Sequence, residues 1–236
     1  MSRATSLEAG DSLVDGLHHI PDIVIRRMPI YVRTLRSLAG SGVETVSSDE
    51  LADLIGVSAA QIRRDLASFG RFGRQGKGYP VAELAETVEE ILHLDRRWDV
   101  GLAGYGNIGR AIAHHRDFLP TFRIAAIFDR RKHGQEEPRT GLRILPPEAI
   151  ADEVARLGIE LGIIAVPADA AQGVADQMIA GGVRALLNYA PVVLRAPGHV
   201  VIREVDPVAA LRSLTYYLDP APAADEPGVT AGLPAG

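Results

Sequence analysis

The chain contains no cysteine, which excludes disulfide bonds, cysteine-ligated zinc and thiol nucleophiles. Aromatic residues make up only 5% of the chain, and no apolar run approaches the roughly 20 residues that a membrane-spanning helix needs. The N-terminus also lacks the charged segment and apolar stretch of a signal peptide. The net charge of −5 shows no overall positive excess of the kind that nucleic-acid-binding proteins often carry. These absences predict a soluble cytoplasmic protein that binds neither a membrane nor a metal.

The rest of the composition is typical of a globular protein, with 47% apolar and 23% charged residues. A length of 236 residues allows one large domain or two of ordinary size. The two ends differ from this body, because 1–17 holds few large apolar residues and 220–236 is rich in Pro, Ala and Gly. Such segments bury too little surface to offset the entropy lost on ordering, so we expect two disordered tails.

Two short helices are predicted between residues 43 and 70. Ser47 is followed by Glu50, and Ser58 by Gln61, which is the spacing of a capping box at the start of each helix. The turn 56–58 between the helices contains a glycine, and an earlier helical segment, 25–40, contains Pro29 either at its start or at a kink. This order predicts a three-helix unit with a helix-turn-helix. The apolar stripes expected to face its core are Leu51, Leu54 and Ile55 on the first short helix and Ile62, Leu66 and Phe69 on the second.

The outward face of the second short helix carries Gln and Arg, the residues that bond base edges and phosphates in a major groove. A glycine-rich loop follows and would form a slim wing against phosphates or in a minor groove. From 58 to 79 there are five basic residues and one acidic residue, inside an otherwise acidic chain. A solvated helix face and a plain hairpin turn are the alternative reading, but the order of caps, turn and basic loop favours DNA binding. The expected DNA-binding residues are Ser58, Gln61, Arg63, Arg64, Ser68, Arg74, Gln75, Gly76, Lys77, Gly78 and Tyr79.

A dinucleotide-binding motif lies near the middle of the chain. An apolar strand, 100–103, runs into Gly104-x-Gly106-x-x-Gly109, and a helical pattern follows. Glycines in this arrangement let the backbone approach a pyrophosphate at the start of a helix. Asp129 ends the next predicted strand, about 20 residues further on, where an acid bonds the ribose hydroxyls of NAD. A glycine turn that binds nothing is the alternative, and the strand, helix and acid in order favour the dinucleotide site.

The remaining sequence alternates strands and helices, which predicts a parallel sheet. We therefore expect an α/β protein, with an N-terminal winged helix-turn-helix domain, a Rossmann-type domain and a C-terminal helix. Residues 81–98 are interpreted as a helix that connects the two domains. The expected boundaries are 1–17 for the first tail, 18–95 for the winged-helix domain and connector, 96–206 for the Rossmann-type domain, 207–219 for the C-terminal helix and 220–236 for the second tail.

The sequence offers no candidate catalytic residue. A dehydrogenase needs a polar catalytic group near the nicotinamide, usually on an additional domain, and the segment after residue 191 is short and largely apolar. His114 and His115 end a helix, where an imidazole is favourable for electrostatic reasons alone. These features favour a sensor whose ligand is its signal. An NAD(P)-dependent oxidoreductase with a small appended helical domain and a structural NAD-bound scaffold are the alternatives.

The residues also resemble a known family. The stretches RRMPIYVRTL, VSSDELADLIGVSAAQIRRDLASFG, GKGY, GYGNIG, VPADAAQGVAD and LNYAPVVL are similar, in this order, to the Rex family of redox-sensing transcriptional repressors. The resemblance implies a homodimer on inverted-repeat operator DNA, with a C-terminal helix swapped between subunits. It also implies that NADH closes the dimer and releases DNA, whereas NAD⁺ permits DNA binding.

The resemblance also implies roles for single residues. Arg63 and Arg64 would contact the major groove, the loop 74–79 would lie in the minor groove, and Arg33 and Asp206 would couple the DNA-binding domain to the cofactor state. The residues implied to bind the cofactor are Gly104, Tyr105, Gly106, Asn107, Ile108, Gly109, Asp129, Val166, Pro167, Asn188, Tyr189, Ala190 and Pro191.

Four positions depart from the family pattern. Gln75 stands where the wing often has Arg, and Pro207 where an aromatic residue often follows the coupling Asp. His115 stands in place of a tyrosine near the nicotinamide, which makes it a third coupling candidate, and Tyr189 replaces the usual Phe. Arg130 and Arg131 next to Asp129 leave NADPH as a second candidate ligand beside NADH and NAD⁺.

Overall fold

The computed structural model describes residues 20–70, 78–115 and 121–218. The chain divides into two compact units, Met1–Arg96 and Arg97–Gly236. The two predicted tails and the wing positions 74–77 lie outside the described residues. Among the residues that are described, no helix is both long and apolar enough to cross a membrane.

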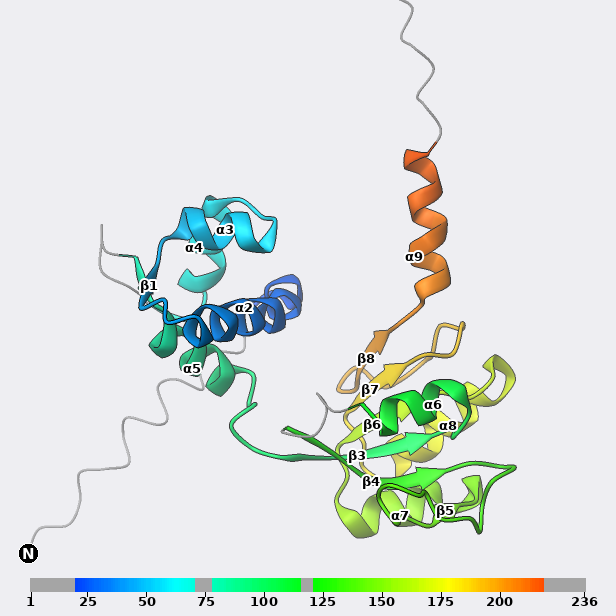
Figure 1. Cartoon of the computed structure of the whole chain (residues 1–236). Helices are drawn as coiled ribbons and strands as arrows, with labels where there is room; N and C mark the ends of the chain where they lie inside the picture. The colour runs from blue at the N-terminus through cyan, green and yellow to red at the C-terminus, as the bar shows by residue number, and fades with distance from the viewer. Residues whose placement is uncertain (1–19, 71–77, 116–120, 219–236) are drawn as a thin grey trace, which may run out of the picture. The chain divides into compact units, whose positions relative to one another are not determined.

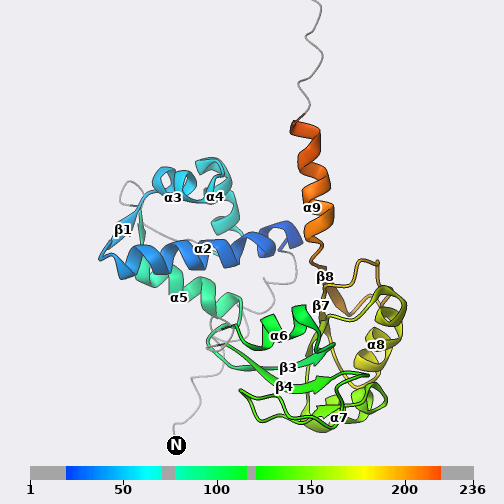
Figure 2. The same ribbon diagram turned by 45° about the vertical axis from the view of Figure 1, so that its right-hand side comes forward.

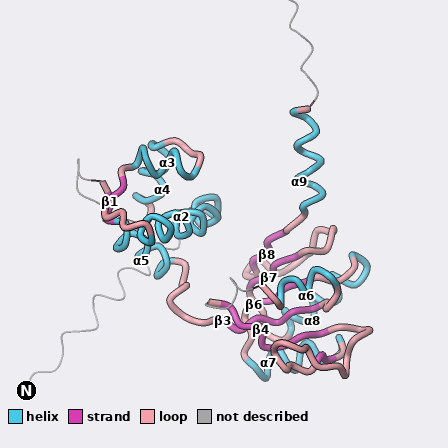
Figure 3. The backbone as a smooth tube through the Cα atoms, viewed as in Figure 1, coloured by secondary structure: helices cyan, strands magenta, loops and turns pink. Residues whose placement is uncertain are grey.

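The first unit is a small helical domain with one two-stranded sheet among its described residues (Figures 1 and 3). The two strands pair antiparallel, with Val46 opposite Tyr79, so the segment before α3 lies beside the segment that leads into α5. This arrangement confirms the predicted winged helix-turn-helix fold. Its elements are α2 (Asp22–Gly40), β1 (Thr45–Val46), α3 (Ser48–Ile55), α4 (Ala59–Ala67), β2 (Tyr79–Pro80) and α5 (Val81–Ile91).

Helix α5 belongs to the core of the first unit, although the sequence suggested only a connector. Leu84 and Val88 are buried, and Arg36 of α2 forms an ion pair with Glu89 of α5. Pro29 lies inside α2, which begins seven residues earlier. The buried apolar residues of this core are Val24, Met28, Tyr31, Leu35, Val46, Leu51, Ala52, Ile62, Leu66, Val81, Leu84, Ala85 and Val88.

The prediction that Leu54 faces this core is wrong, because its side chain is 58% exposed. Leu51 and Ala52 are the buried residues of α3, and Ile55 packs beside them. With about 3.6 residues per turn, these three positions share one arc and Leu54 falls outside it. The apolar pattern of the sequence did not identify Ala52 as a core position, because its side chain is small. On α4 the predicted inward face, Ile62, Leu66 and Phe69, is confirmed.

The second unit is built on a six-stranded sheet in the order β5-β4-β3-β6-β7-β8, with every neighbouring pair parallel. Renumbered within the unit, this order is 3-2-1-4-5-6, which confirms the predicted Rossmann-type fold. Connections leave the sheet in opposite directions from β3 and β6, so a crevice is expected at the carboxyl ends of these two strands. The strands are β3 (Trp98–Ala103), β4 (Phe122–Phe128), β5 (Ile144–Leu145), β6 (Leu161–Ile164), β7 (Ala185–Asn188) and β8 (Val201–Glu204).

Helices cover both faces of this sheet (Figure 2). Helix α6 (Asn107–Ala113) packs on one face, where Leu102 meets Ile112. Helices α7 (Ile150–Leu157) and α8 (Ala168–Ala180), with the short helix η2 (Pro147–Ala149), pack on the other. The neighbour of Leu102, Ala103, belongs to that second cluster, as the alternation of side chains along a strand requires.

The chain ends in helix α9 (Pro207–Leu214) and the single turn η3 (Thr215–Tyr217). Asp206 caps α9 by accepting hydrogen bonds from the backbone N–H groups of Val208 and Ala209, each at 2.9 Å. Every residue from 206 to 218 is exposed, including Leu211 at 63% and Leu214 at 56%. An apolar helix face of this kind is typical of a surface that a partner covers.

Candidate DNA-binding face and dinucleotide site

The two short helices of the first unit begin differently. The predicted capping box of α3 is confirmed, since Ser47 Oγ accepts from the N–H of Glu50 at 3.1 Å and Glu50 Oε2 accepts from the N–H of Ser47 at 2.8 Å. The predicted box of α4 is wrong in its second half. Ser58 Oγ accepts from the N–H of Gln61 at 3.2 Å, but the Gln61 side chain turns to Asp65 instead of the cap. The charged carboxylate of Asp65, one turn later, forms a stronger hydrogen bond with the Gln61 amide than the neutral backbone N–H of Ser58 would.

Asp65 is fully buried behind α4 and accepts four hydrogen bonds. Two come from Arg27 Nε and Nη2 at 2.7 Å, one from Tyr31 Oη at 2.7 Å, and one from Gln61 Nε2 at 2.6 Å. Burial alone would raise the pKa of Asp65, but these hydrogen bonds and the Arg27 charge outweigh it and hold the pKa below its ordinary value. Asp65 therefore anchors α4 to α2 as a carboxylate. In the sequence, Asp65 stands out only as the single acid in a basic segment.

The exposed face of α4 carries the predicted positive charge. Arg63, Arg64 and Ser68 are exposed, whereas Gln61 is half-buried. Arg63 Nη1 donates to Ser48 Oγ of α3 at 2.7 Å, and Arg64 Nη1 donates to Gln61 Oε1 at 3.2 Å. Both guanidinium groups are thus oriented by a neighbour and keep further N–H donors for an acidic ligand.

The base of the wing needs a glycine. Gly78 has a φ of +73°, and a Cβ on it would lie 2.6 Å from the carbonyl oxygen of Val46. Tyr79 follows in β2 and packs against the core of the unit. The other wing residues predicted to contact DNA, Arg74, Gln75, Gly76 and Lys77, lie outside the described residues.

The three glycines of the dinucleotide motif have distinct geometric roles. Gly104 has a φ of +95°, and a Cβ on it would lie 2.3 Å from the carbonyl oxygen of Ala165. A Cβ on Gly109 would lie 1.9 Å from the carbonyl oxygen of Gly104, so only glycine lets α6 approach the turn. A Cβ on Gly106 would have no described atom within 4 Å. The first and third glycines therefore serve the turn itself, while the second leaves its backbone open to a ligand.

Asp129 lies beside this turn and holds it. One carboxylate oxygen accepts from the N–H of Tyr105 at 2.8 Å, and the other from the N–H groups of Arg131 and Lys132 at 2.8 and 2.9 Å. Burial would raise the pKa of Asp129, but these backbone hydrogen bonds lower it further than burial raises it. Lys132 Nζ in turn donates to the carbonyl oxygen of Tyr105 at 2.8 Å. Asp129 is therefore an ionised acceptor at the position expected to meet a ribose.

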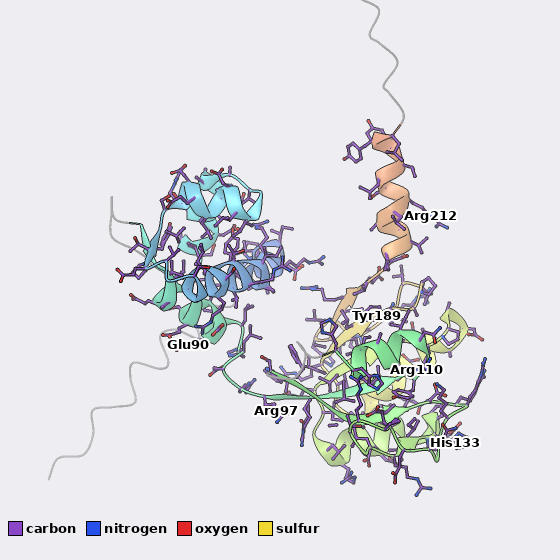
Figure 4. The ribbon with its side chains drawn as sticks, in the orientation of Figure 1. Glu90, Arg97, Arg110, His133, Tyr189 and Arg212 are labelled. Atoms are coloured by element: carbon purple, nitrogen blue, oxygen red, sulfur yellow. The ribbon has the colours of Figure 1, made fainter. Side chains whose placement is uncertain are left out.

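The remaining predicted cofactor residues lie at the same edge of the sheet. Val166 and Pro167 follow β6, and Asn188 ends β7. Asn188 is buried, and its side chain closes the turn that follows by bonding the backbone of Ala190 and the carbonyl oxygen of Val192. The carboxyl ends of adjacent parallel strands share one edge, so the structure brings the predicted set together. Figure 4 shows the side chains of Arg110 on α6 and Tyr189 after β7.

A second buried carboxylate, Glu137, supports the glycine turn, although no pattern in the sequence predicted this role. Glu137 Oε1 accepts from Tyr105 Oη at 2.9 Å and lies 2.7 Å from His114 Nε2, while Thr140 donates both its N–H and its hydroxyl to Oε2 at 2.6 Å. Burial would raise its pKa, but these hydrogen bonds and those from the Arg139 N–H lower it to about 2. Little in the sequence indicates this role, because the segment EEPRT is a charged loop without the apolar periodicity of a helix or a strand.

We predict that Glu137 makes the second unit sensitive to acid. A carboxyl whose pKa falls from 4.5 to about 2 on folding contributes about 3 kcal/mol, present above pH 4.5 and lost as the pH falls toward 2. The single tryptophan, Trp98, begins β3, so its fluorescence during urea unfolding follows this unit. The free energy of unfolding should fall through this pH range in the wild type and fall less in Glu137→Gln. Equal pH slopes in the two proteins would contradict the prediction.

The three residues predicted to couple the domains lie in separate parts of the fold. Arg33 is exposed on α2 in the first unit. Asp206 is exposed in the second unit and caps α9, and His115 is exposed just after α6. Their predicted coupling therefore stays a prediction.

Comparison with known proteins gives matches over both units. Residues 19–67 match the family described as "Putative DNA-binding protein N-terminus", and 95–192 match the family described as "CoA binding domain". The redox-sensing transcriptional repressor Rex of Roseiflexus sp. (strain RS-1) is 48% identical over 206 residues, which are 87% of this chain and 94% of that protein. The Rex of Pelotomaculum thermopropionicum is 43% identical, over 84% of this chain and 94% of that protein.

Two solved structures of RSP, a Rex-family repressor, are also similar. RSP in complex with β-NAD⁺ and operator DNA matches with a TM-score of 0.79 and 37% identity, covering 84% of this chain and 92% of RSP. RSP in complex with β-NADH matches with a TM-score of 0.76 and 35% identity, covering 85% of this chain and 94% of RSP.

Proposed function

The chain belongs to the Rex family of redox-sensing transcriptional repressors, and we propose that it binds operator DNA through its first unit and NADH or NAD⁺ through its second. NADH binding releases the operator, whereas NAD⁺ permits binding. The main observation behind this proposal is that one chain contains both a helix-turn-helix with exposed arginines and a glycine turn beside Asp129, an acid placed to bond a ribose. The ligands of RSP, operator DNA with NAD⁺ in one structure and NADH in another, support this assignment.

The mechanism is an equilibrium between two arrangements of a homodimer. DNA favours one arrangement and NADH the other, so each ligand weakens the other by the same coupling free energy, typically 1–3 kcal/mol. The exposed apolar face of α9 supports a dimer in which this helix packs on the partner subunit. Two DNA-binding units related by a twofold axis require an inverted-repeat operator. Such a regulator acts by binding, in the cytoplasm, without metal and without catalysing a reaction.

The coupling is proposed to run through Arg33, Asp206 and His115. Arg33 and Asp206 would form a pair that links the DNA-binding unit to the cofactor state, and His115 would respond to the nicotinamide. Replacing Asp206 with Asn keeps a side-chain oxygen that can cap α9 but removes the charge that Arg33 would meet. We therefore expect Asp206→Asn to bind NADH and DNA but to show a weaker effect of one on the other.

The deciding experiment measures operator binding by fluorescence anisotropy at fixed salt, with the operator sequence that was crystallised with RSP. NADH, NAD⁺ and NADPH are titrated separately into the protein–DNA complex. Release by NADH at concentrations where NAD⁺ has little effect supports the redox sensor. Release by NADPH at similar concentrations would extend the ligand to the phosphorylated dinucleotide, as Arg130 and Arg131 beside Asp129 allow. Tight binding that no nucleotide changes would overturn the sensing part of the proposal.

The oxidoreductase alternative predicts hydride transfer, which the nicotinamide absorbance reports directly. Steady oxidation of bound NADH by a small carbonyl substrate would support it against the sensor. The scaffold alternative predicts no affinity for DNA at all, and the anisotropy experiment tests that point.

We predict that Arg64→Ala weakens operator binding about 10- to 100-fold, because a base contact by arginine contributes roughly 1–3 kcal/mol. The slope of log affinity against log salt should change by no more than about one unit, since a single charge is removed. Arg184→Ala is the control, because Arg184 is an exposed arginine of the second unit paired with Glu160. Similar losses in both variants would indicate nonspecific electrostatics and not a recognition helix.

A further inference from the structure

The amide nitrogen of Gln61 is already used within the protein. Gln61 Nε2 donates to Asp65 Oδ1 at 2.6 Å, and Asp65 is fully buried. A glutamine that reads adenine uses its whole amide, donating from nitrogen to N7 and accepting at oxygen from the N6 amino group. One of the two N–H groups of this nitrogen is taken by Asp65, so the amide is fixed toward the core and is not free to turn its nitrogen and oxygen together to an adenine. The adenine contact usual for glutamine in a major groove is therefore unfavourable for this residue.

The free end of the same amide meets an arginine. Arg64 Nη1 donates to Gln61 Oε1 at 3.2 Å, and the two residues are three positions apart on one face of α4. Arg64 is exposed, whereas Gln61 is half-buried. The amide thus lies between a buried anion and an exposed cation, with its dipole aligned to both. This contact leaves Arg64 Nε and Nη2 as donors, which is enough for a bidentate contact to guanine O6 and N7.

The inner end of this chain of hydrogen bonds is rigid. Asp65 is held by Arg27 through two hydrogen bonds and by Tyr31 through one, and both residues lie on α2. Its carboxylate cannot turn without leaving a buried charge or a buried hydroxyl unpaired. The orientation of the Gln61 amide is therefore set by the core and not by the DNA.

We propose that Gln61 is a positioning residue for Arg64 and not an independent reader of a base. The path runs from α2 through Asp65 and Gln61 to Arg64, and it limits the directions in which Arg64 can approach a base pair. This inference deepens the proposed function and depends on it. Arg63 is independent of the path, because its guanidinium is held by Ser48 of α3.

A double-mutant cycle on the operator tests the proposal. Gln61→Ala, Arg64→Ala and the double variant are compared by anisotropy in the full-length protein. We expect Gln61→Ala to weaken binding roughly 5- to 30-fold and the double variant to bind no more weakly than Arg64→Ala alone. A cycle of Gln61→Ala with Arg63→Ala is the matched control, and there the two losses should multiply. Gln61→Met keeps the length of the side chain without the amide, so it separates positioning from loss of helix packing.

The second measurement maps base preference, which a purely structural role would not move selectively. Each base pair of one operator half-site is substituted in turn. Gln61→Met and Arg64→Ala should lose discrimination at the same base pair. Multiplicative losses in the Gln61–Arg64 cycle, a separate A·T position that depends on Gln61, or wild-type binding by Gln61→Met would each overturn the proposal. Failure of the wild type to bind the operator would instead overturn the proposed function, and this inference with it.

Discussion

Asp65→Ala is expected to lower the free energy of unfolding of the first unit by about 3–5 kcal/mol. The reason is that removing one partner of a buried ion pair leaves the other without compensation. Asp65 is fully buried and accepts from Arg27, Tyr31 and Gln61, so the variant leaves several donors unpaired at once. The measurement is urea unfolding followed by circular dichroism, which reports the helices of both units, with Trp98 fluorescence recording the second unit alone. A transition seen by circular dichroism but not by Trp98 fluorescence is that of the first unit.

Arg26→Ala is the matched control. Arg26 also pairs with an aspartate, Asp22, but both side chains are 55% exposed, so we expect a change of at most about 0.5 kcal/mol. The sign of the pH effect follows from the lowered pKa of Asp65. Its contribution is present above the ordinary value of 3.8 and is lost as the pH falls below it. A change in Asp65→Ala no larger than in Arg26→Ala would show that the buried network does not stabilise the unit.

Gly109→Ala is expected to weaken NADH binding by roughly 100-fold, because a Cβ placed 1.9 Å from the carbonyl oxygen of Gly104 forces α6 away from the turn. The variant should also lose the release of operator by NADH. Operator binding without nucleotide should persist, because the helix-turn-helix lies in the other unit. Isothermal titration with NADH and the anisotropy experiment measure these two properties.

Two further glycines make the result specific. Gly106→Ala adds a methyl group where no described atom lies within 4 Å, so it should leave stability unchanged and weaken NADH binding only if the ligand approaches that backbone. Gly173→Ala on α8 adds a methyl group that likewise meets no described atom, and NADH affinity should stay at the wild-type level. Wild-type NADH affinity in Gly109→Ala would contradict the assignment of the turn as the pyrophosphate site.

Local patterns in the sequence were sufficient to predict both units. Hydroxyl caps, a glycine turn and apolar spacing indicate a helix-turn-helix, because each depends on residues within one or two helical turns. The glycine motif and Asp129 likewise indicate a dinucleotide site, because the order of strand, turn, helix and strand is itself local. One error arose where a residue had a stronger partner nearby, and another where a small residue took the core position instead of a large apolar one. Gln61 has the spacing of a capping residue but bonds the buried Asp65, and Leu54 has an apolar side chain but lies outside the arc that Leu51 and Ala52 bury.

The fold class, the two units and the turn on which a dinucleotide is expected to bind can all be predicted from the amino-acid order, because short-range spacing encodes all three. The pairing of the buried polar groups, in contrast, depends on the packing of distant elements. Asp65 meets Arg27 across 38 residues, and Glu137 meets Tyr105 across 32, so no local pattern predicts either contact. A buried carboxylate must take its donors from whichever elements pack around it, and those elements come together only when the chain folds.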